Sequence, residues 1–227
     1  IRIGDPAEQI VDGAEEMIDP VIVMTTRGRS GIGRWIYGSV AERVVRGAGV
    51  PVLLIRSGMK QPEGGTFRRI MVPLDGSAYA EAALSYAVQI ARAFDAELSL
   101  VRVAETTQIY AMLTPSAQAP ASVETLNEVV AQLVADANAY LAKVGERLTG
   151  EGLRVRTQTL EGIAAEQLLA YEQEEDIDLV VMATHGRSGF SRLVFGSVAE
   201  RVLRLGKTPV MMVKPKGEIA ESGDAGN

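Results

Sequence analysis

The sequence predicts an α/β fold in which an open parallel sheet of five strands carries helices on both faces. Short apolar runs alternate with longer segments whose apolar residues recur at helical spacing. Strands that alternate with helices imply crossover connections, and therefore parallel neighbours. Residues 179–183 are apolar throughout, which is typical of a strand that is buried on both faces of such a sheet.

An internal repeat predicts that one such module is complete and that a second is partial. Residues 27–56 and 185–214 are identical at fifteen of thirty aligned positions, at a constant offset of 158. The first copy has nothing that corresponds to residues 70–158, so we expect a first module that is truncated at its N-terminus. The expected organisation is residues 1–56 as the C-terminal part of a first module, 57–67 as a linker, 68–214 as the complete second module and 215–227 as a disordered tail.

The elements of the complete module follow a linker that is rich in Gly, Pro and polar residues. Residues 69–74 predict a buried strand that leads into the turn Asp75-Gly76, and Ser77 is a typical N-cap for the next helix, whose apolar residues recur up to Phe94. The elements expected beyond that helix are a strand at 97–103, a mobile loop at 106–122, a helix at 123–148, a strand at 153–160, a helix at 163–173, a strand at 178–183, a helix from 197 and a last strand at 209–213.

Composition excludes several classes of function. The chain has 227 residues, 47% of them hydrophobic, which is enough for a packed core. Its net charge of −6 and pI near 5.0 argue against a general nucleic-acid binder. It has no cysteine, which excludes disulfides and thiolate catalysis, and its single histidine, His185, cannot form a multi-His metal site. No signal peptide or membrane-spanning run is visible, so we expect a cytoplasmic protein without a membrane partner.

The pattern of glycines predicts a ligand site at the carboxyl ends of the first and fourth strands of the complete module, where the winding of such sheets reverses. The loop after the fourth strand is rich in small residues and ends at Gly196-Ser197, where a helix begins. Small residues let the backbone approach phosphate oxygens, and a helix N-terminus adds free amides. A capping box formed by Ser197 and Glu200 is the alternative interpretation, as for Ser39 and Glu42 in the first copy. The pattern alone leaves both open.

The chain resembles the universal stress protein family. The resemblance lies in the sequences IMVPLDGS at 70–77, VMATHGR at 181–187 and GSVAE at 196–200. It covers residues 68–214 as a whole module and 1–56 as the back part of another. It implies a Rossmann-like fold of the nucleotide-binding α-hydrolase-like type.

The nucleotide-binding branch of that family has the pattern Gly, two residues, Gly, nine residues, Gly, then Ser or Thr. Gly186, Gly196 and Ser197 fit this pattern, whereas Ala183 takes the place of the first glycine. In the first copy Gly28, Gly38 and Ser39 fit, and Thr25 takes that place. The first copy also lacks a counterpart of Asp75 or Val103, so we expect it not to bind nucleotide.

The resemblance implies ATP, with Mg²⁺ on its phosphates, as the ligand of the complete module. It places carboxylate and apolar groups around the adenosine and small residues around the phosphates. The residues that it carries over are Asp75 at the ribose or adenine edge with Pro73 and Leu74 beside it, Val103 against the adenine, Met182 and Ala183 along the base and ribose, His185, Gly186 and Arg187 facing the phosphates, and Gly196, Ser197 and Val198 closing the cradle.

The implied function is that of a stress-response sensor or regulator that binds ATP and is not an enzyme. A non-nucleotide-binding, dimerising scaffold or signalling module of the same fold is the alternative. The chain has neither a Gly-x-x-x-x-Gly-Lys-Ser/Thr loop nor a Gly-x-Gly-x-x-Gly after its first strand.

The apolar last strands of the two modules, residues 51–55 and 209–213, are expected at sheet edges, where unpaired backbone invites association. In the resembling family modules associate through this strand. We therefore expect self-association of the modules there, and a homodimer is a further expectation. The strand at 21–24 is expected to lack a neighbour on one side.

Overall fold

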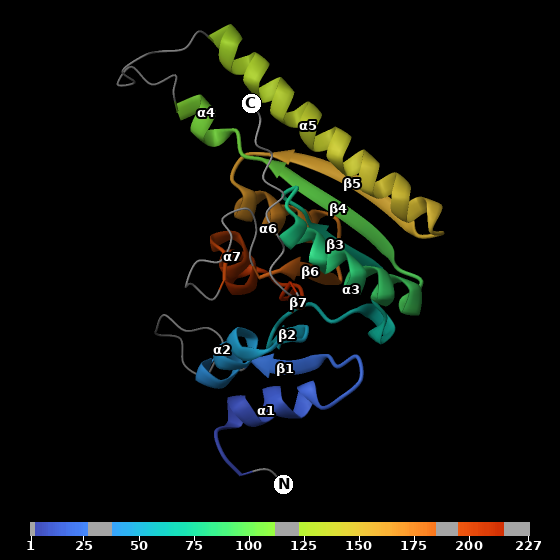
Figure 1. The fold of residues 1–227 in the computed structure, drawn as a ribbon. Helices are drawn as coiled ribbons and strands as arrows, with labels where there is room; N and C mark the ends of the chain where they lie inside the picture. The colour runs from blue at the N-terminus through green and yellow to red at the C-terminus, as the bar shows by residue number, and fades with distance from the viewer. Residues whose placement is uncertain (1–2, 27–37, 112–122, 185–194, 216–227) are drawn as a thin grey trace, which may run out of the picture.

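The computed structural model describes residues 3–26, 38–111, 123–184 and 195–215 (Figure 1). The first part of the chain forms α1 (Pro6–Glu15), β1 (Ile22–Thr26), α2 (Gly38–Gly47), β2 (Val52–Arg56) and the 3₁₀ turn η1 (Glu63–Gly65). The rest forms β3 (Arg69–Pro73), α3 (Ala78–Phe94), β4 (Glu97–Ala104), α4 (Thr107–Ala111), α5 (Val123–Gly150), β5 (Arg154–Glu161), α6 (Ala164–Glu174), β6 (Leu179–Ala183), α7 (Ser197–Leu205) and β7 (Val210–Val213).

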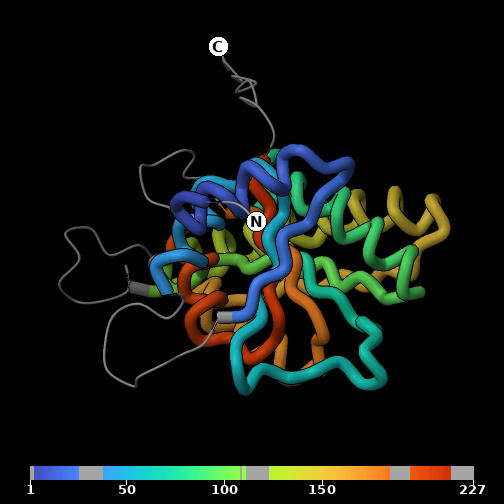
Figure 2. Tube along the Cα trace, turned by 90° about the horizontal axis from the view of Figure 1, so that it is seen from below, coloured from blue at the N-terminus to red at the C-terminus, as the bar shows by residue number. Residues whose placement is uncertain are grey.

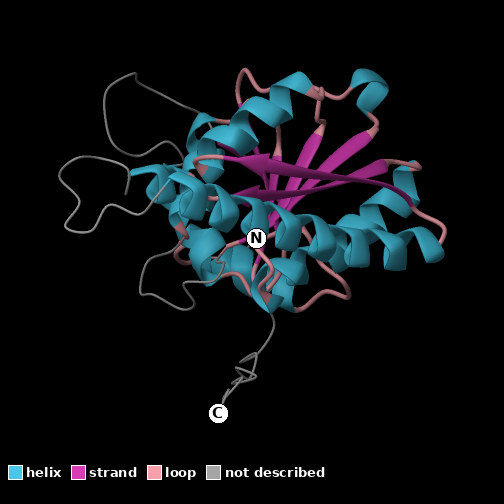
Figure 3. Ribbon diagram, turned by 90° about the horizontal axis from the view of Figure 1, so that it is seen from above, coloured by secondary structure: helices cyan, strands magenta, loops and turns pink. Residues whose placement is uncertain are grey.

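All the strands join one seven-stranded sheet in the order β1-β2-β7-β6-β3-β4-β5. The five strands from β3 to β7 are parallel to one another, and helices cover both faces of the sheet (Figure 3). The predicted fold class is therefore confirmed. Among the described residues no helix combines the length and the apolar character that a membrane crossing requires.

Side chains that alternate along each strand divide the core into two layers. Ile70 and Val72 of β3 pack in the layer under α3 and α5. Met71, between them, packs in the opposite layer under α1, α2, α6 and α7. β6 repeats this division, since Val181 belongs to the first layer and Val180 to the second. The sheet is thus buried on both faces, as the unbroken apolar character of β6 predicts.

The segment at 106–122, expected as a loop, begins with a short helix. The amides of Ile109 and Tyr110 both donate hydrogen bonds to the carbonyl oxygen of Thr106, at 3.0 and 3.1 Å, and this turn opens α4. The loop prediction is therefore wrong for Thr107–Ala111, because one helical turn has too few residues to show a period. The remainder, 112–122, lies outside the described residues, as does the predicted disordered tail beyond Pro215.

The last strands of the two copies pair with each other. β2 runs antiparallel to β7, and Leu53 lies opposite Met211 (Figure 2, cyan beside red). The predicted pairing of these strands is confirmed within the chain, because each is the outermost strand of its own copy on this side and the other strand covers its edge. Each has neighbours on both sides, so neither is open to a second copy, and the edges of the sheet are β1 and β5.

The linker is fastened to the second copy by an ion pair. The Lys60 ammonium lies 2.9 Å from the buried carboxylate of Asp178 and 2.8 Å from the exposed carboxylate of Asp176. The other Asp178 oxygen accepts hydrogen bonds from the amides of Arg68 and Arg69, at 2.8 and 3.1 Å. Burial alone would raise the pKa of Asp178, but these donors outweigh it and lower that pKa below its ordinary value.

Arg56, at the end of β2, holds the C-terminus of α7. Its guanidinium donates to the carbonyl oxygen of Arg204 at 2.6 Å and to that of Gly206. These carbonyls lie at the C-terminal end of α7. Carbonyl groups at a helix C-terminus receive no hydrogen bond from within the helix, and they carry a partial negative charge. A residue of the partial copy therefore supports a helix of the complete one.

We predict that Asp178→Asn lowers the free energy of unfolding by about 2 kcal/mol at neutral pH, because the Lys60 ammonium loses its buried partner. The pKa of Asp178 is lowered on folding, so its contribution is complete above the unfolded-state value of about 3.9 and disappears as pH falls through the lower folded-state value. Urea unfolding of both proteins across a pH series measures this difference.

Glu63→Gln is the matched control, because it removes an exposed ion pair with Arg68 in the same segment, and such pairs contribute little. A difference between wild type and Asp178→Asn that stays constant from neutral to strongly acidic pH would contradict the assignment.

Candidate functional site

β3 and β6 separate toward their carboxyl ends. They pair only where Ile70 lies opposite Leu179 and Met71 opposite Val180. β4 follows β3 as far as Pro73, and β7 follows β6 to its end. The chain winds outward from β3 through β5 and then returns to β6 on the other side of β3, so this gap is the switch point of the sheet.

Pro73 helps to explain where the pairing stops. The amide of Leu74 donates to the carbonyl oxygen of Val101 in β4 at 2.8 Å. Because successive residues of a central strand bond to opposite neighbours, the backbone of Pro73 faces β6. Proline has no amide hydrogen, so β3 has no donor to extend the ladder toward β6 at this position.

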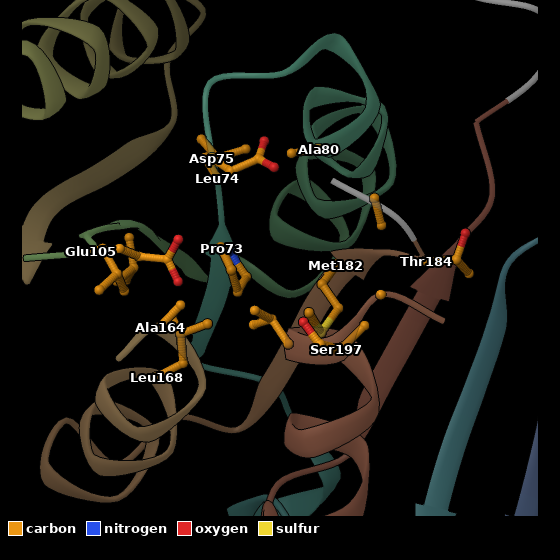
Figure 4. A pocket seen from close by; sticks show the side chains of 16 residues that line it. Pro73, Leu74, Asp75, Ala80, Glu105, Ala164, Leu168, Met182, Thr184 and Ser197 are labelled. Carbon is orange, nitrogen blue, oxygen red and sulfur yellow. The ribbon is translucent and has the colours of Figure 1, made fainter. Parts of the chain in front are cut away.

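A cavity of about 290 Å³ occupies this gap (Figure 4). Every predicted site residue that the structure describes lines it. These residues are Pro73, Leu74, Asp75, Val103, Met182, Ala183, Gly196, Ser197 and Val198. The predicted His185, Gly186 and Arg187 lie outside the described residues.

Sequence reasoning missed the rest of the lining. Further residues that line the cavity are Ala80, Val101, Glu105, Ala164, Leu168, Thr184 and Ala199. Val101 could have been found, because it lies two positions before Val103 and so shares its face of β4. Ala164 and Leu168 share a face of α6 at helical spacing, but no signal in the sequence places that helix beside the cavity.

The walls of the cavity are apolar. Val101 and Val103 come from β4, Leu168 from α6 and Met182 from β6. Val101, Leu168 and Met182 are also buried in the core layer under α6 and α7. The slot is therefore held by close-packed core side chains, and a flat apolar group of a ligand would lie against them.

The N-terminus of α7 forms one polar end of the cavity. Gly196 is its N-cap, and the Gly196 amide donates to the carbonyl oxygen of Thr184 at 2.9 Å. The first amide bonded within the helix is that of Glu200, which donates to the Gly196 carbonyl oxygen at 2.9 Å. The amides of Ser197, Val198 and Ala199 precede it, so they have no acceptor inside the helix. All three residues line the cavity, which therefore presents amides and the positive end of a helix dipole to a ligand.

The capping-box interpretation of Ser197 and Glu200 is wrong. Ser197 is the first residue inside α7, and the N-cap is Gly196, which has no side chain to cap the helix. α2 likewise begins at Gly38, so Ser39 lies inside that helix. The Ser197 hydroxyl makes no hydrogen bond within the described residues, and it is exposed at the cavity.

Asp75 forms the turn that the sequence predicts, and the turn orients its side chain. One carboxylate oxygen of Asp75 accepts from the amide of Ser77 at 2.9 Å and from its hydroxyl at 2.6 Å. The Ser77 hydroxyl oxygen accepts from the Ala80 amide at 3.1 Å, which confirms Ser77 as the N-cap of α3. Gly76 has a φ of +88°, and a Cβ there would lie 3.3 Å from the Arg102 guanidinium. Only glycine therefore suits this turn.

Arg102 stands behind the turn, on the other face of β4 from the apolar wall. Its guanidinium lies 4.9 Å from the centre of the Tyr140 ring, within the range of a cation–π contact. The Tyr140 hydroxyl donates to a Glu81 carboxylate oxygen at 2.9 Å. Burial and this neighbouring carboxylate raise the pKa of Tyr140, so its hydroxyl stays a donor at neutral pH. These contacts support the turn that carries Asp75.

The charged side chains in the described part of the lining are two carboxylates, Asp75 and Glu105. They lie at the ends of β3 and β4, whereas the free amides lie at α7. Within the described residues no group of three metal-ligating side chains gathers. The cavity thus combines hydrogen-bond acceptors, an apolar slot and the N-terminus of a helix.

A doubly wound α/β protein with a ligand cavity at its switch point is the class that this fold and site define. The chain belongs to the universal stress protein family, whose sequence model matches residues 1–56 and 66–214. Universal stress protein MJ0531 of Methanocaldococcus jannaschii is 32% identical over 153 residues, which are 67% of this chain and 85% of that protein. Universal stress protein Rv2623 of Mycobacterium tuberculosis is 27% identical over an alignment that covers 94% of this chain and 71% of that protein.

Solved structures show the same architecture. The protein MJ0577, the subject of a structure-based assignment of function, superposes with a TM-score of 0.58 at 25% identity, over 67% of this chain and 99% of its own. A universal stress protein from Archaeoglobus fulgidus superposes with a TM-score of 0.64 at 24% identity, over 93% of this chain and 66% of its own. The shorter relatives thus match about two thirds of this chain and the longer ones nearly all of it, which is consistent with a tandem arrangement.

We predict that Ser77→Ala lowers the free energy of unfolding by about 1 kcal/mol, because the first turn of α3 loses its cap. The matched control is Ser85→Ala, which removes an exposed hydroxyl from the middle of the same helix and should leave stability within about 0.5 kcal/mol of wild type. Thermal and urea unfolding measure both. Equal effects of the two substitutions would contradict the assignment of Ser77 as the cap.

Proposed function

We propose that the protein binds an adenine nucleotide, specifically ATP, in the cavity between β3 and β6, and that it acts as a stress-response sensor or regulator. One observation carries the proposal. The same cavity is lined by apolar side chains of β4, α6 and β6, by the carboxylates that follow β3 and β4, and by the N-terminus of α7, where three amides have no acceptor within the helix. A nucleotide has this distribution of groups, with a flat base, hydroxyl donors on its ribose and an anionic tail.

The adenine would lie in the apolar slot, with one face on Val101 and Val103 and the other toward Leu168 and Met182. These side chains are fixed by the core, so ordering them on binding costs little conformational entropy. The Asp75 carboxylate, oriented by its own turn, would accept a hydrogen bond from the ribose or the adenine edge. The apolar slot would hold the plane of the adenine, and the Asp75 carboxylate would determine how the nucleoside is oriented within the slot.

The phosphates would lie at the N-terminus of α7. The amides of Ser197 and Val198 and the hydroxyl of Ser197 are the donors that the described residues offer. The amide of Gly196 is already bonded to Thr184, so Gly196 contributes space rather than a donor. Mg²⁺ would be held by the phosphates, since the described residues offer no metal site of their own. The phosphate contacts of His185 and Arg187 stay a prediction.

Ala183 is the point at which this chain departs from the nucleotide-binding pattern. It ends β6 opposite Val213 and lies on the cavity wall. Relative to glycine, its side chain adds a single methyl group to that wall. We therefore propose that the substitution is tolerated. The alternative, a scaffold without nucleotide, requires that this methyl group exclude the ligand.

Titration calorimetry of the chain with ATP and Mg²⁺ tests the proposal. We expect one nucleotide per chain, because the first copy has no strands that correspond to β3 and β4. Gly196→Leu should weaken ATP binding about 100-fold or more, because Gly196 lines the cavity beside the first turn of α7 and a bulky side chain there would take up space that the ligand needs. Gly196 has a φ of −62°, so leucine is accommodated without backbone strain.

The matched control is Gly150→Leu, at the end of α5, where a Cβ meets no atom within 4 Å. It should bind ATP like wild type. Absence of ATP binding by the folded wild-type chain would contradict the proposal and favour the scaffold. If wild type and a folded Gly196→Leu variant bound ATP with equal affinity, that result would contradict binding of the phosphates at α7.

A further inference from the structure

Glu105 is a carboxylate of the cavity that the pattern of glycines does not reveal. It directly follows β4, which pairs in parallel with β3. The carboxyl ends of neighbouring parallel strands meet at one edge of a sheet, so Glu105 and Asp75 lie on the same side of the cavity. Figure 4 shows the Glu105 carboxylate turned toward Pro73.

The two carboxylates differ in what they already bind. One oxygen of Asp75 is engaged by the amide and hydroxyl of Ser77. Glu105 makes no hydrogen bond or ion pair with any described residue. Both of its oxygens are therefore acceptors for a ligand, and an ionised carboxylate requires donors rather than phosphate oxygens.

We propose that Glu105 selects the sugar of the nucleotide by accepting a hydrogen bond from the ribose 2′-hydroxyl. The inference rests on the proposed function, because a base in the slot and phosphates at α7 leave the ribose between them, beside the ends of β3 and β4. The end of the second strand is also where α/β sheets that bind dinucleotides carry the acidic residue that holds this hydroxyl. The negative charge of Glu105 would further repel a 2′-phosphate, so both 2′-deoxy and 2′-phosphorylated nucleotides are disfavoured.

The affinities of ATP and 2′-deoxy-ATP, measured for wild type and for Glu105→Ala, test this directly. Wild type should prefer ATP by about tenfold or more, as expected for one hydrogen bond to a charged group. In Glu105→Ala the ratio of the affinity for ATP to the affinity for 2′-deoxy-ATP should fall close to one. The ratio is the informative quantity, because both ligands carry the same triphosphate and any general gain from removing a negative charge cancels. Glu105→Gln keeps an acceptor without the charge and should retain part of the preference.

Glu161→Ala is the matched control. Glu161 ends β5, pairs with Ala104 in the neighbouring strand and is exposed, but it does not line the cavity. It removes the same charge from the same edge of the sheet and should leave the preference for ATP as in wild type.

The outcomes separate the two proposals. A preference for ATP that is the same in Glu105→Ala as in wild type overturns the role of Glu105 and leaves nucleotide binding intact. A preference for ATP over inosine triphosphate that disappears in Glu105→Ala, while the preference over 2′-deoxy-ATP remains, would place the carboxylate at the base and overturn it as well. A wild-type chain that binds no nucleotide overturns the proposed function, and the inference about Glu105 with it.

Discussion

The separation of β3 from β6 is the constraint on which the cavity depends. A parallel sheet must bury both faces, so its helices cross over on both sides and the winding has to reverse somewhere. Here it reverses beside β3, and the ladder stops after Met71 and Val180. Pro73 carries no amide that could continue it. The gap that remains ends where β3 and β6 pair, and residues of β4, α6 and α7 line it.

α7 connects this cavity to the partial first copy. Its N-terminal turn lines the cavity, and its C-terminal carbonyls accept hydrogen bonds from Arg56 of β2. β2 is paired with β7, and Lys60 of the linker is held by Asp178. A helix end that donates free amides must be held in position, because its donors stabilise an anion only if they need no reorganisation. The first copy therefore contributes support to the site.

The sequence predicts elements best where the local pattern and the packing agree. β6 is apolar throughout and buried on both faces, and Ser77 precedes a periodic helix that it caps. The glycines and small residues around Gly196 likewise mark the end of the cavity where backbone is exposed. Each of these features depends on a few residues that are adjacent in the sequence.

Features that depend on three-dimensional neighbours could not be predicted in this way. Ser197 and Glu200 have the spacing of a capping box, yet the amide of Gly196 is bonded to Thr184, and the helix begins one residue earlier than that box requires. Glu105 follows a strand like many polar residues, and only the position of β4 beside β3 brings it to the cavity.

The central claim is that the free amides of α7 bind the anionic tail of a nucleotide whose base lies in the apolar slot. Amide resonances of the assigned protein, followed by NMR during addition of ATP with Mg²⁺ and, separately, of adenosine, test it most directly. The account predicts that the Val103 amide shifts with both ligands and that the amides of Ser197 and Val198 shift with ATP but not with adenosine. Saturating ATP that leaves the amides of Ser197 and Val198 unmoved would contradict it.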